Sequence, residues 1–186
     1  MQQDPMPSKV SIRPSEVRDL AAITAIYAHH VLHGLASFEI DPPDAAEMAR
    51  RREQVRAQGL PHLVVELDGR VLGYAYAALY RARPAYRFTV EDSIYIEAGA
   101  MGRGAGRLLL GRLVAECTRA GYRQMIAVIG DCDNAASIGL HAACGFKPAG
   151  SLRFVGYKFG RWVDSVMMQR ELGEGHRSAP GNGGPL

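Results

Sequence analysis

The sequence is short of cysteine and has no motif that pairs cysteines for a metal or a redox reaction. Its three cysteines are an odd number without a Cys-x-x-Cys pair. This argues against a disulfide framework and a zinc site, and favours reduced thiols in the cytoplasm. Cys117 and Cys144 fit apolar helical patterns and are expected in the core, whereas Cys132 lies between Asp131 and Asp133, which disfavour its thiolate.

The sequence also lacks a long apolar run and a run of charge of one sign. Its longest apolar stretch, residues 71–80, is about half the length that spans a bilayer. Residues 1–9 lack the apolar core of a signal peptide. The 22 basic and 19 acidic residues give a net charge of +3, and no basic cluster stands out. We therefore expect a cytoplasmic protein with no membrane partner and no nucleic-acid partner.

A chain of 186 residues, 47% of them hydrophobic, predicts one domain. We expect this domain over residues 9–172, because no repeat or linker interrupts it. Residues 1–8 and 173–186 are predicted to be disordered from their composition. Periodicity, caps and turn residues predict helices and strands in a mixed α/β order. The expected helices are 16–33, with Ser15 as its cap, then 45–58, 104–120 and a short one ending at 143; the expected strands are 10–13, 62–67, 71–79, 89–97 and 124–129, followed by a hairpin over 146–171 around Gly156.

A glycine-rich turn, Gly102-Arg103-Gly104-Ala105-Gly106, joins a predicted strand to a predicted helix. A turn of this kind exposes unpaired backbone N–H groups and the positive end of the helix dipole. The combination forms an anion site, usually for phosphate. Arg103 and Arg107 add positive charge, and the glycines let a ligand approach the backbone.

Three phosphate-binding loops compete for this turn, beside a plain flexible connection. A Walker loop ends in Lys-Ser/Thr, which is missing here. A dinucleotide loop has Gly-x-Gly-x-x-Gly, whereas this chain has Gly-x-Gly-x-Gly. The third pattern, (Gln/Arg)-x-x-Gly-x-(Gly/Ala), is the acetyl-CoA loop of the GNAT superfamily of acetyltransferases. Residues 101–106 resemble it after the first position, which holds Met101.

Residues 134–146 are similar to a second GNAT signature, Asn-x-x-Ala-x-x-Leu-Tyr-x-x-x-Gly-Phe. Asn134 matches, Ser137 stands in place of the alanine, and His141 stands in place of the tyrosine. The resemblance implies that Asn134 binds the pantetheine arm of CoA. It also implies that residue 141 protonates the leaving thiolate, and histidine can donate a proton as tyrosine does.

Two further segments resemble the phosphinothricin N-acetyltransferases and their methionine sulfoximine and methionine sulfone relatives. Residues 83–95 are similar to Arg-x-Ala-Tyr-x-Trp-Thr-Val-Glu-x-(Ser/Thr)-x-Tyr, and residues 156–164 match Gly-x-Lys-x-Gly-x-Trp-x-Asp. The resemblance implies the GNAT fold, with a mixed, mostly antiparallel sheet of about seven strands and about four helices. It further implies acetyl-CoA as co-substrate without a metal, a small amino acid or analogue as acceptor, direct attack in a ternary complex, and a homodimer.

Acetyl transfer to an α-ammonium group is helped by a base, because the amine is mostly protonated at neutral pH. Glu91 is the candidate, and the open alternative is a structural carboxylate that pairs with Arg83 or Arg87. The resemblance places the oxyanion and pantetheine against the strand backbone, and the pyrophosphate against the glycine loop. The implied cofactor-binding residues are Ile94, Tyr95, Ile96, Gly102, Arg103, Gly104, Ala105, Gly106, Arg107, Asn134 and Ser137.

The substrate ligands are expected just before Glu91 in the sequence. Arg81, Arg83 and Tyr86 are candidates together with Phe38, because arginine binds a carboxylate through two parallel hydrogen bonds. A solvated loop is the alternative for the loop residues. Two rival functions also stay open at this point: a different phosphate-ligand enzyme such as a kinase or reductase, and a non-catalytic dimeric CoA-binding module.

Overall fold

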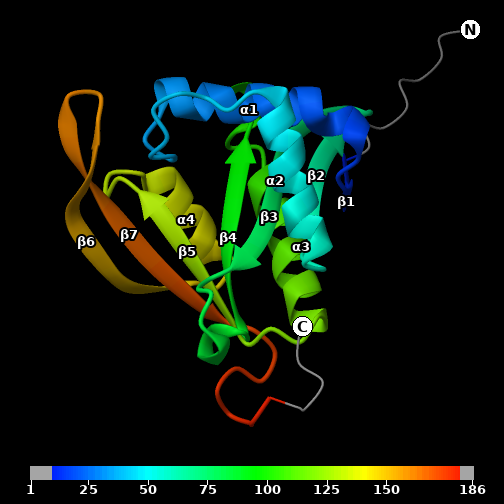
Figure 1. Ribbon diagram of the computed structural model, residues 1–186, viewed down its shortest axis with the longest axis vertical. Coiled ribbons are helices and arrows are strands. Elements are labelled where there is room, and N and C mark those ends of the chain that lie inside the picture. The colour runs from blue at the N-terminus through cyan, green and yellow to red at the C-terminus, as the bar shows by residue number, and fades with distance from the viewer. Residues whose placement is uncertain (1–9, 181–186) are drawn as a thin grey trace, which may run out of the picture.

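Seven strands form one mixed sheet in the computed structural model, which describes residues 10–180 (Figure 1). The strand order is β1-β2-β3-β4-β5-β7-β6. All neighbouring strands are antiparallel except β4 and β5, which are parallel. This is the predicted mixed, mostly antiparallel sheet. The strands are β1 (Val10–Pro14), β2 (His62–Leu67), β3 (Arg70–Leu79), β4 (Thr89–Ile96), β5 (Gln124–Gly130), β6 (Lys147–Lys158) and β7 (Arg161–Glu171).

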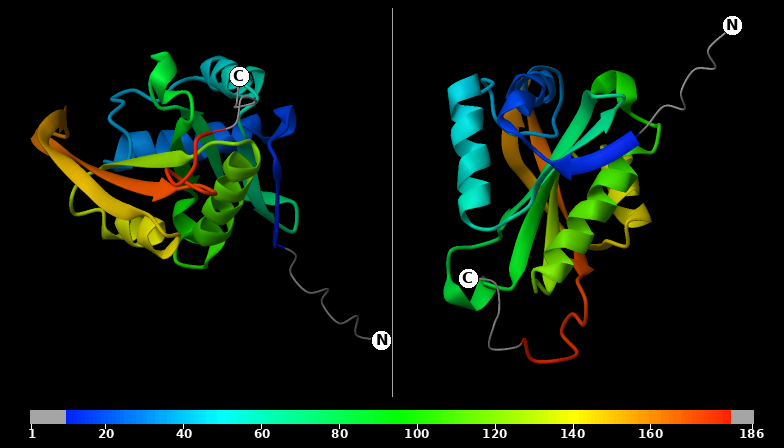
Figure 2. Two further views of the ribbon diagram at one scale, coloured as in Figure 1. Left: turned by 90° about the horizontal axis from the view of Figure 1, so that it is seen from below. Right: turned by 90° about the vertical axis from the view of Figure 1, so that its right-hand side faces the viewer.

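Helices cover both faces of the sheet, with α1 and α2 on one side and α3 and α4 on the other, as the right-hand view of Figure 2 shows. Each side has its own core. Ile23 of α1 and Tyr74 of β3 belong to one core, and Leu109 of α3 and Met125 of β5 belong to the other. Successive side chains of a strand therefore serve different cores. The α-helices are α1 (Leu20–His33), α2 (Ala45–Ala57), α3 (Ala105–Arg119) and α4 (Ala135–Ala143), and the short 3-10 turns are η1 (Val17–Asp19), η2 (Pro84–Tyr86) and η3 (Ala98–Ala100).

The first helix begins later than the sequence predicts. Residues 17–19 form a 3-10 turn, and the regular helix starts at Leu20. Ser15 is not the cap, because its buried hydroxyl accepts a hydrogen bond from Arg52 Nε at 2.7 Å. Asp19 closes the turn instead, accepting from the Glu16 amide at 2.7 Å, while its carboxylate also binds Arg13. The expected cap of α2 does form, because Asp44 accepts from the Glu47 amide at 2.8 Å.

The last hairpin turns at Phe159–Gly160, so the prediction of a turn at Gly156 is wrong. Both turn residues have positive φ, 51° and 74°, as a type I′ hairpin turn requires. Gly156 lies inside β6 and pairs with Val163. A Cβ at Gly156 would lie 2.6 Å from the ring of Phe38, so this glycine makes room for a distant aromatic side chain.

The chain after β7 follows a defined path as far as residue 180. The Gly175 amide donates to Leu172 O at 2.9 Å, and the Arg177 amide donates to Glu174 O at 3.1 Å. Composition predicted disorder for residues 173–186, and the structure differs from that expectation over residues 173–180. Residues 181–186 and the predicted lead-in, 1–8, lie outside the described residues. None of the helices between residues 10 and 180 has the length and apolar character to cross a membrane.

Candidate active site

Strands β4 and β5 separate partway along their length and leave a cleft between them. Their pairing ends at Asp92. The Glu97 amide donates to β3, and because backbone amides alternate in direction along a strand, those of Ile94 and Ile96 point into the opening. The Tyr95 amide points to β3, so the structure offers two of the three predicted amides to the cleft. The cleft is lined by Ala36, Asp92, Ser93, Ile94, Tyr95, Ala127, Val128, Ile129, Gly130, Asn134, Ser137 and His141.

The glycine loop follows the open end of β4 and leads into α3. Gly102 and Gly104 have φ of +74° and +84°, and a Cβ at either position would meet nothing within 4 Å. The loop backbone is therefore open to an approaching ligand. Gly106 instead allows α3 to pack closely on α4, because a Cβ added there would lie 3.2 Å from the side chain of Leu140. Exposed Arg103 and the first amides of α3 lie together at the start of this helix, as an anion site requires, and anion binding here stays a prediction. Of the other predicted loop residues, Ala105 is buried and Arg107 is exposed.

Asn134 and Ser137 bring the first turn of α4 to the cleft. Asn134 Oδ1 accepts from the Ser137 amide at 3.1 Å, and its Nδ2 donates to Gly130 O at 3.4 Å. Asn134 thus caps the helix while it lines the cleft. Its predicted contact with pantetheine stays a prediction.

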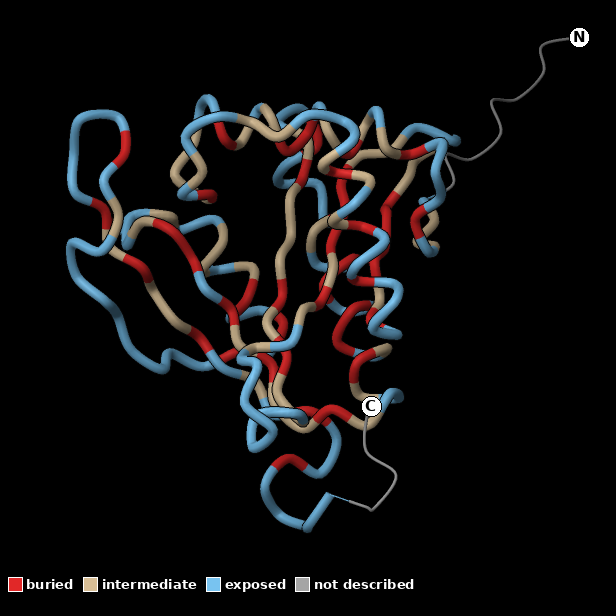
Figure 3. Tube along the Cα trace, in the orientation of Figure 1, coloured by how far each residue is buried: buried red, intermediate tan, exposed pale blue. Residues whose placement is uncertain are grey.

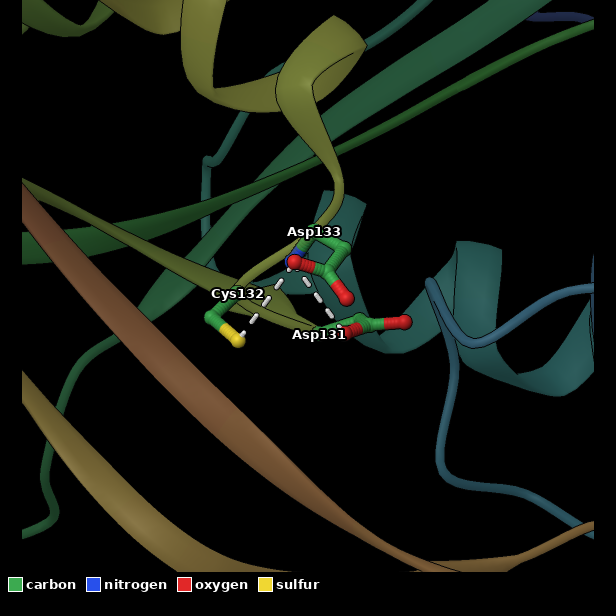
Figure 4. A group of neighbouring side chains, drawn as sticks. All are labelled: Asp131, Cys132 and Asp133. Carbon is green, nitrogen blue, oxygen red and sulfur yellow. Dashed lines mark hydrogen bonds between the residues drawn. The ribbon is translucent and has the colours of Figure 1, made fainter.

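The loop between β5 and α4 holds three polar side chains whose ligand atoms lie within 4.8 Å of one another, Asp131, Cys132 and Asp133 (Figure 4). The Asp133 amide donates to Asp131 at 3.2 Å, and Arg161 donates to the other oxygen of that carboxylate at 2.7 Å. Desolvation and the neighbouring carboxylates raise the pKa of the Cys132 thiol, as its sequence position predicts. These contacts explain the cluster as a turn with an ion pair, and the expected absence of a metal stays a prediction.

Glu91 points away from the cleft side of β4. Alternation places it with Tyr95, which packs on Tyr27 of α1, whereas Val90 and Asp92 face α3. Its half-buried position raises the pKa of Glu91, and the charge of Asp92 raises it further against the opposing effect of Arg81. No ion pair joins Glu91 to Arg83 or Arg87 within residues 10–180. The carboxylate therefore lacks the arginine partner that a structural role would require. The geometry leaves the carboxylate able to accept a proton.

The predicted substrate ligands fall into two places. Arg81, Arg83 and Tyr86 are exposed on the loop before β4. Arg81 lies over the ring of Tyr80 at 5.0 Å and is close enough to Glu91 to lower its pKa. Arg83 and Tyr86 lie at the solvent-exposed rim of the same loop.

Phe38 belongs to the loop after α1 and contacts the ends of β5 and β6. A Cβ at Gly130 would lie 3.0 Å from its ring, and one at Gly156 closer still. Lys158, whose pKa is lowered by burial, ties this loop to β6, because its Nζ donates to Gly34 O at 2.9 Å and Ser37 O at 2.7 Å. The structure therefore separates the elements that hold Phe38 from the arginine loop.

Sequence reasoning missed a cavity of about 230 Å³ between α2 and the sheet. Ala78 in its wall lies directly opposite Glu91 across the β3–β4 ladder. Burial lowers the pKa of His62 in this wall to about 4, so the imidazole is neutral at pH 7. Tyr74 and Tyr76, two residues apart on one face of β3, were the signal that this face is aromatic. The cavity is lined by Tyr27, Met48, Arg51, Arg52, Gln54, Val55, Gln58, His62, Tyr74, Tyr76 and Ala78.

Residues 24–146 match the family model described as Acetyltransferase (GNAT) family. The chain belongs to the GNAT family. It is 59% identical over 162 residues to a phosphinothricin N-acetyltransferase of Alcaligenes faecalis. The aligned residues cover 87% of this chain and 82% of that protein. It is 41% identical over 165 residues to an L-methionine sulfoximine/L-methionine sulfone acetyltransferase of Salmonella typhimurium, covering 89% and 96% of the two chains.

A solved GNAT structure shows the same fold. It is a phosphinothricin acetyltransferase from Sinorhizobium meliloti in complex with AcCoA, with a TM-score of 0.91, 47% identity and 94% coverage of each chain. These matches confirm the predicted family, the fold and the enzyme class, an N-acetyltransferase. They give no support to a kinase, a reductase or a non-catalytic module. The predicted roles of individual site residues stay predictions.

Proposed function

We propose that this GNAT enzyme transfers acetyl from acetyl-CoA to the α-amino group of a small amino acid or analogue, of the phosphinothricin, methionine sulfoximine or methionine sulfone type. The observation that carries the proposal is the arrangement of β4. Its open side forms a cleft, the chain that leaves this strand continues into the glycine loop, and its other side carries the half-buried Glu91 beside a cavity. The names of the relatives support the substrate class.

In the proposed complex, the pyrophosphate of acetyl-CoA binds the glycine loop and the pantetheine arm lies along the cleft. The amides of Ile94 and Ile96 then donate to the pantetheine arm or to the oxyanion of the tetrahedral intermediate. Glu91 takes a proton from the substrate ammonium, directly or through a water. The free amine attacks the thioester carbon, and His141 supplies the proton for the sulfur as the C–S bond breaks.

Arg81 is proposed to bind the α-carboxylate of the acceptor, because of the two arginines predicted as ligands it is the one that acts on Glu91. A charged hydrogen bond contributes about 1.5–3 kcal/mol, so Arg81→Ala should lower kcat/KM for methionine sulfone roughly ten- to a hundred-fold. The KM for acetyl-CoA should stay unchanged. Steady-state kinetics with the amino acid and with its carboxamide measure this effect.

Replacing the substrate's carboxylate by a carboxamide should lower kcat/KM of the wild type. The same replacement should lower kcat/KM of Arg81→Ala little further. Arg112→Ala, which removes an exposed arginine paired with Glu116 on α3, is the matched control. Arg83→Ala tests the other candidate ligand in the same assay. If Arg81→Ala and Arg83→Ala both process methionine sulfone as the wild type does, the proposed carboxylate site is wrong.

A homodimer is also proposed, formed through the β6–β7 hairpin. The hairpin extends from the body of the molecule in Figure 1, and Figure 3 shows β6 exposed along nearly its whole length. Apolar surface concentrated on one element favours association. The side chains concerned are Leu152, Phe154, Val155, Tyr157, Phe159 and Trp162, each at least 50% exposed.

Sedimentation velocity tests the dimer. The wild type should show a molecular mass of about twice the 20.2 kDa of one chain at micromolar concentration. Trp162→Glu should lower that mass toward the value of one chain, because a charge replaces a large apolar side chain. A monomeric wild type contradicts the proposal. A cytoplasmic location is proposed as well, supported by the three free thiols.

A further inference from the structure

Asp92 and His141 form a buried pair at the wall of the cleft. His141 Nε2 lies 3.0 Å from Asp92 Oδ2, and the two side chains are 3% and 1% exposed. The other ring nitrogen, Nδ1, lies 2.7 Å from the carbonyl oxygen of Ser137 and 3.4 Å from its hydroxyl. A carbonyl oxygen only accepts hydrogen bonds, so Nδ1 carries a hydrogen and donates it.

This geometry determines how many protons the pair holds. With Nδ1 protonated, the short approach of Nε2 to Oδ2 needs one proton between them, because a bare nitrogen lone pair facing a carboxylate in a buried place is unfavourable. That proton resides on the imidazole, because imidazole is ordinarily a stronger base than a carboxylate. The pair is then an imidazolium beside a carboxylate, electrically neutral as a whole, and it holds one transferable proton next to the cleft.

The surroundings of the pair keep that proton in place. Burial by itself lowers the pKa of His141, but the hydrogen bond and charge of Asp92, helped by the Ser137 carbonyl, raise it overall. The thiols of Cys117 on α3 and Cys144 after α4 also face this region, and burial raises the pKa of both, so they stay neutral.

The remaining neighbours add one aromatic ring and one free acceptor. Glu91 is adjacent in sequence but faces the opposite side of the sheet, and the ring of Phe146 meets the His141 ring edge-on at 5.1 Å. Asp92 Oδ1 is buried without a partner among the described residues.

We propose that Asp92 is a positioning residue that keeps on His141 the proton which replaces the one that the departing CoA thiolate takes. The inference rests on the proposed acetyl transfer. As the C–S bond of the tetrahedral intermediate breaks, its electron pair moves to sulfur. The sulfur takes the proton of the cleft-lining Ser137 hydroxyl, which is replaced by the proton from His141 Nδ1, 3.4 Å away, while Nε2–H stays bonded to Asp92. The pair is then one proton short and regains it from solvent. The amine loses two protons over the reaction, of which one balances the proton on sulfur and one is released.

Asp92→Asn tests this role because it keeps the size of the side chain and removes the charge that holds the proton. We expect kcat to fall roughly hundred-fold, within the usual range for general acid catalysis, with little change in KM for acetyl-CoA. The descending limb of the kcat profile, which reports loss of the proton from His141, should move to lower pH. Asp19→Asn, which removes another buried carboxylate in an ion pair with Arg13, is the matched control and should leave both measurements unchanged.

Nitrogen NMR of the histidine rings gives a readout that does not depend on turnover. In the wild type, both nitrogens of His141 should titrate together above pH 6.5, and Asp92→Asn should move that titration below 6.5. A wild-type His141 that is singly protonated at neutral pH overturns the proposal, as does an Asp92→Asn enzyme with an unmoved pH limb. If the wild type acetylates no amino acid, the proposed function fails, while the NMR titration still decides whether the pair holds its proton.

Discussion

Replacing Glu91 with glutamine should lower kcat by about 10² to 10⁴ at neutral pH while the fold is retained. General base catalysis is typically worth this much, and glutamine keeps the shape of the side chain but cannot take the proton. The carboxylate has no ion-pair partner within residues 10–180, so its loss leaves no charge unpaired. Thiol release from acetyl-CoA with methionine sulfone as acceptor measures the rate, and circular dichroism checks the fold.

The pH dependence sharpens this test. Wild-type activity should rise as Glu91 loses its proton, and burial and Asp92 place that pKa above the usual range for glutamate. The Glu91→Gln enzyme depends on free amine supplied by solvent, so its deficit should shrink as the pH approaches the amine pKa. Glu97→Gln, at the end of the same strand in an exposed pair with Arg70, is the control and should behave as wild type. Near-full activity of Glu91→Gln at neutral pH would show that the residue is structural.

Gly104→Ala should weaken acetyl-CoA binding roughly ten- to a hundred-fold. The new Cβ stands where the loop backbone is open, and it displaces the pyrophosphate from one charge-assisted hydrogen bond, which contributes about 1.5–3 kcal/mol. Isothermal titration calorimetry with acetyl-CoA measures the dissociation constant.

Backbone strain must be separated from lost contacts, because Gly104 has φ of +84°. Gly59→Ala supplies the matched control. Gly59 also has positive φ, +68°, and also has nothing within 4 Å of a Cβ, but it lies after α2 and away from the cleft. The two variants should lose similar stability in urea unfolding, since both put a side chain into the left-handed region. Equal acetyl-CoA affinity in both variants contradicts the assignment of the loop.

The parts of the fold that local patterns control were predictable. Strand β2 begins and ends where its turn residues predict, and the Asp68-Gly69 turn joins it to β3. The glycine loop and the cap of α4 are also local, because their residues act on amides within a few positions. For this reason the sequence alone predicts the glycine loop and the start of α4, where acetyl-CoA is proposed to bind.

The parts that failed depend on contacts between distant residues. Gly156 looks like a turn residue, but Phe38 requires it as a strand residue. Ser15 looks like a helix cap, but Arg52 takes its hydroxyl. The bond between Asp92 and His141 joins residues 49 positions apart, so no local spacing indicates it. The arginine loop is exposed, and an exposed loop has no periodicity from which to infer where its side chains point.

The central claim is that the acceptor is the α-amino group of a small amino acid. Wild-type enzyme is incubated with acetyl-CoA and a matched set of amines: methionine sulfone, phosphinothricin, methionine sulfone carboxamide, and a cationic amine without a carboxylate. Product mass spectra locate the acetyl group, and thiol release counts the turnovers. The account predicts one acetyl on the α-nitrogen per CoA released, with the carboxylate-bearing acceptors preferred. Preference for the cationic amine, or acetylation at another atom, contradicts it.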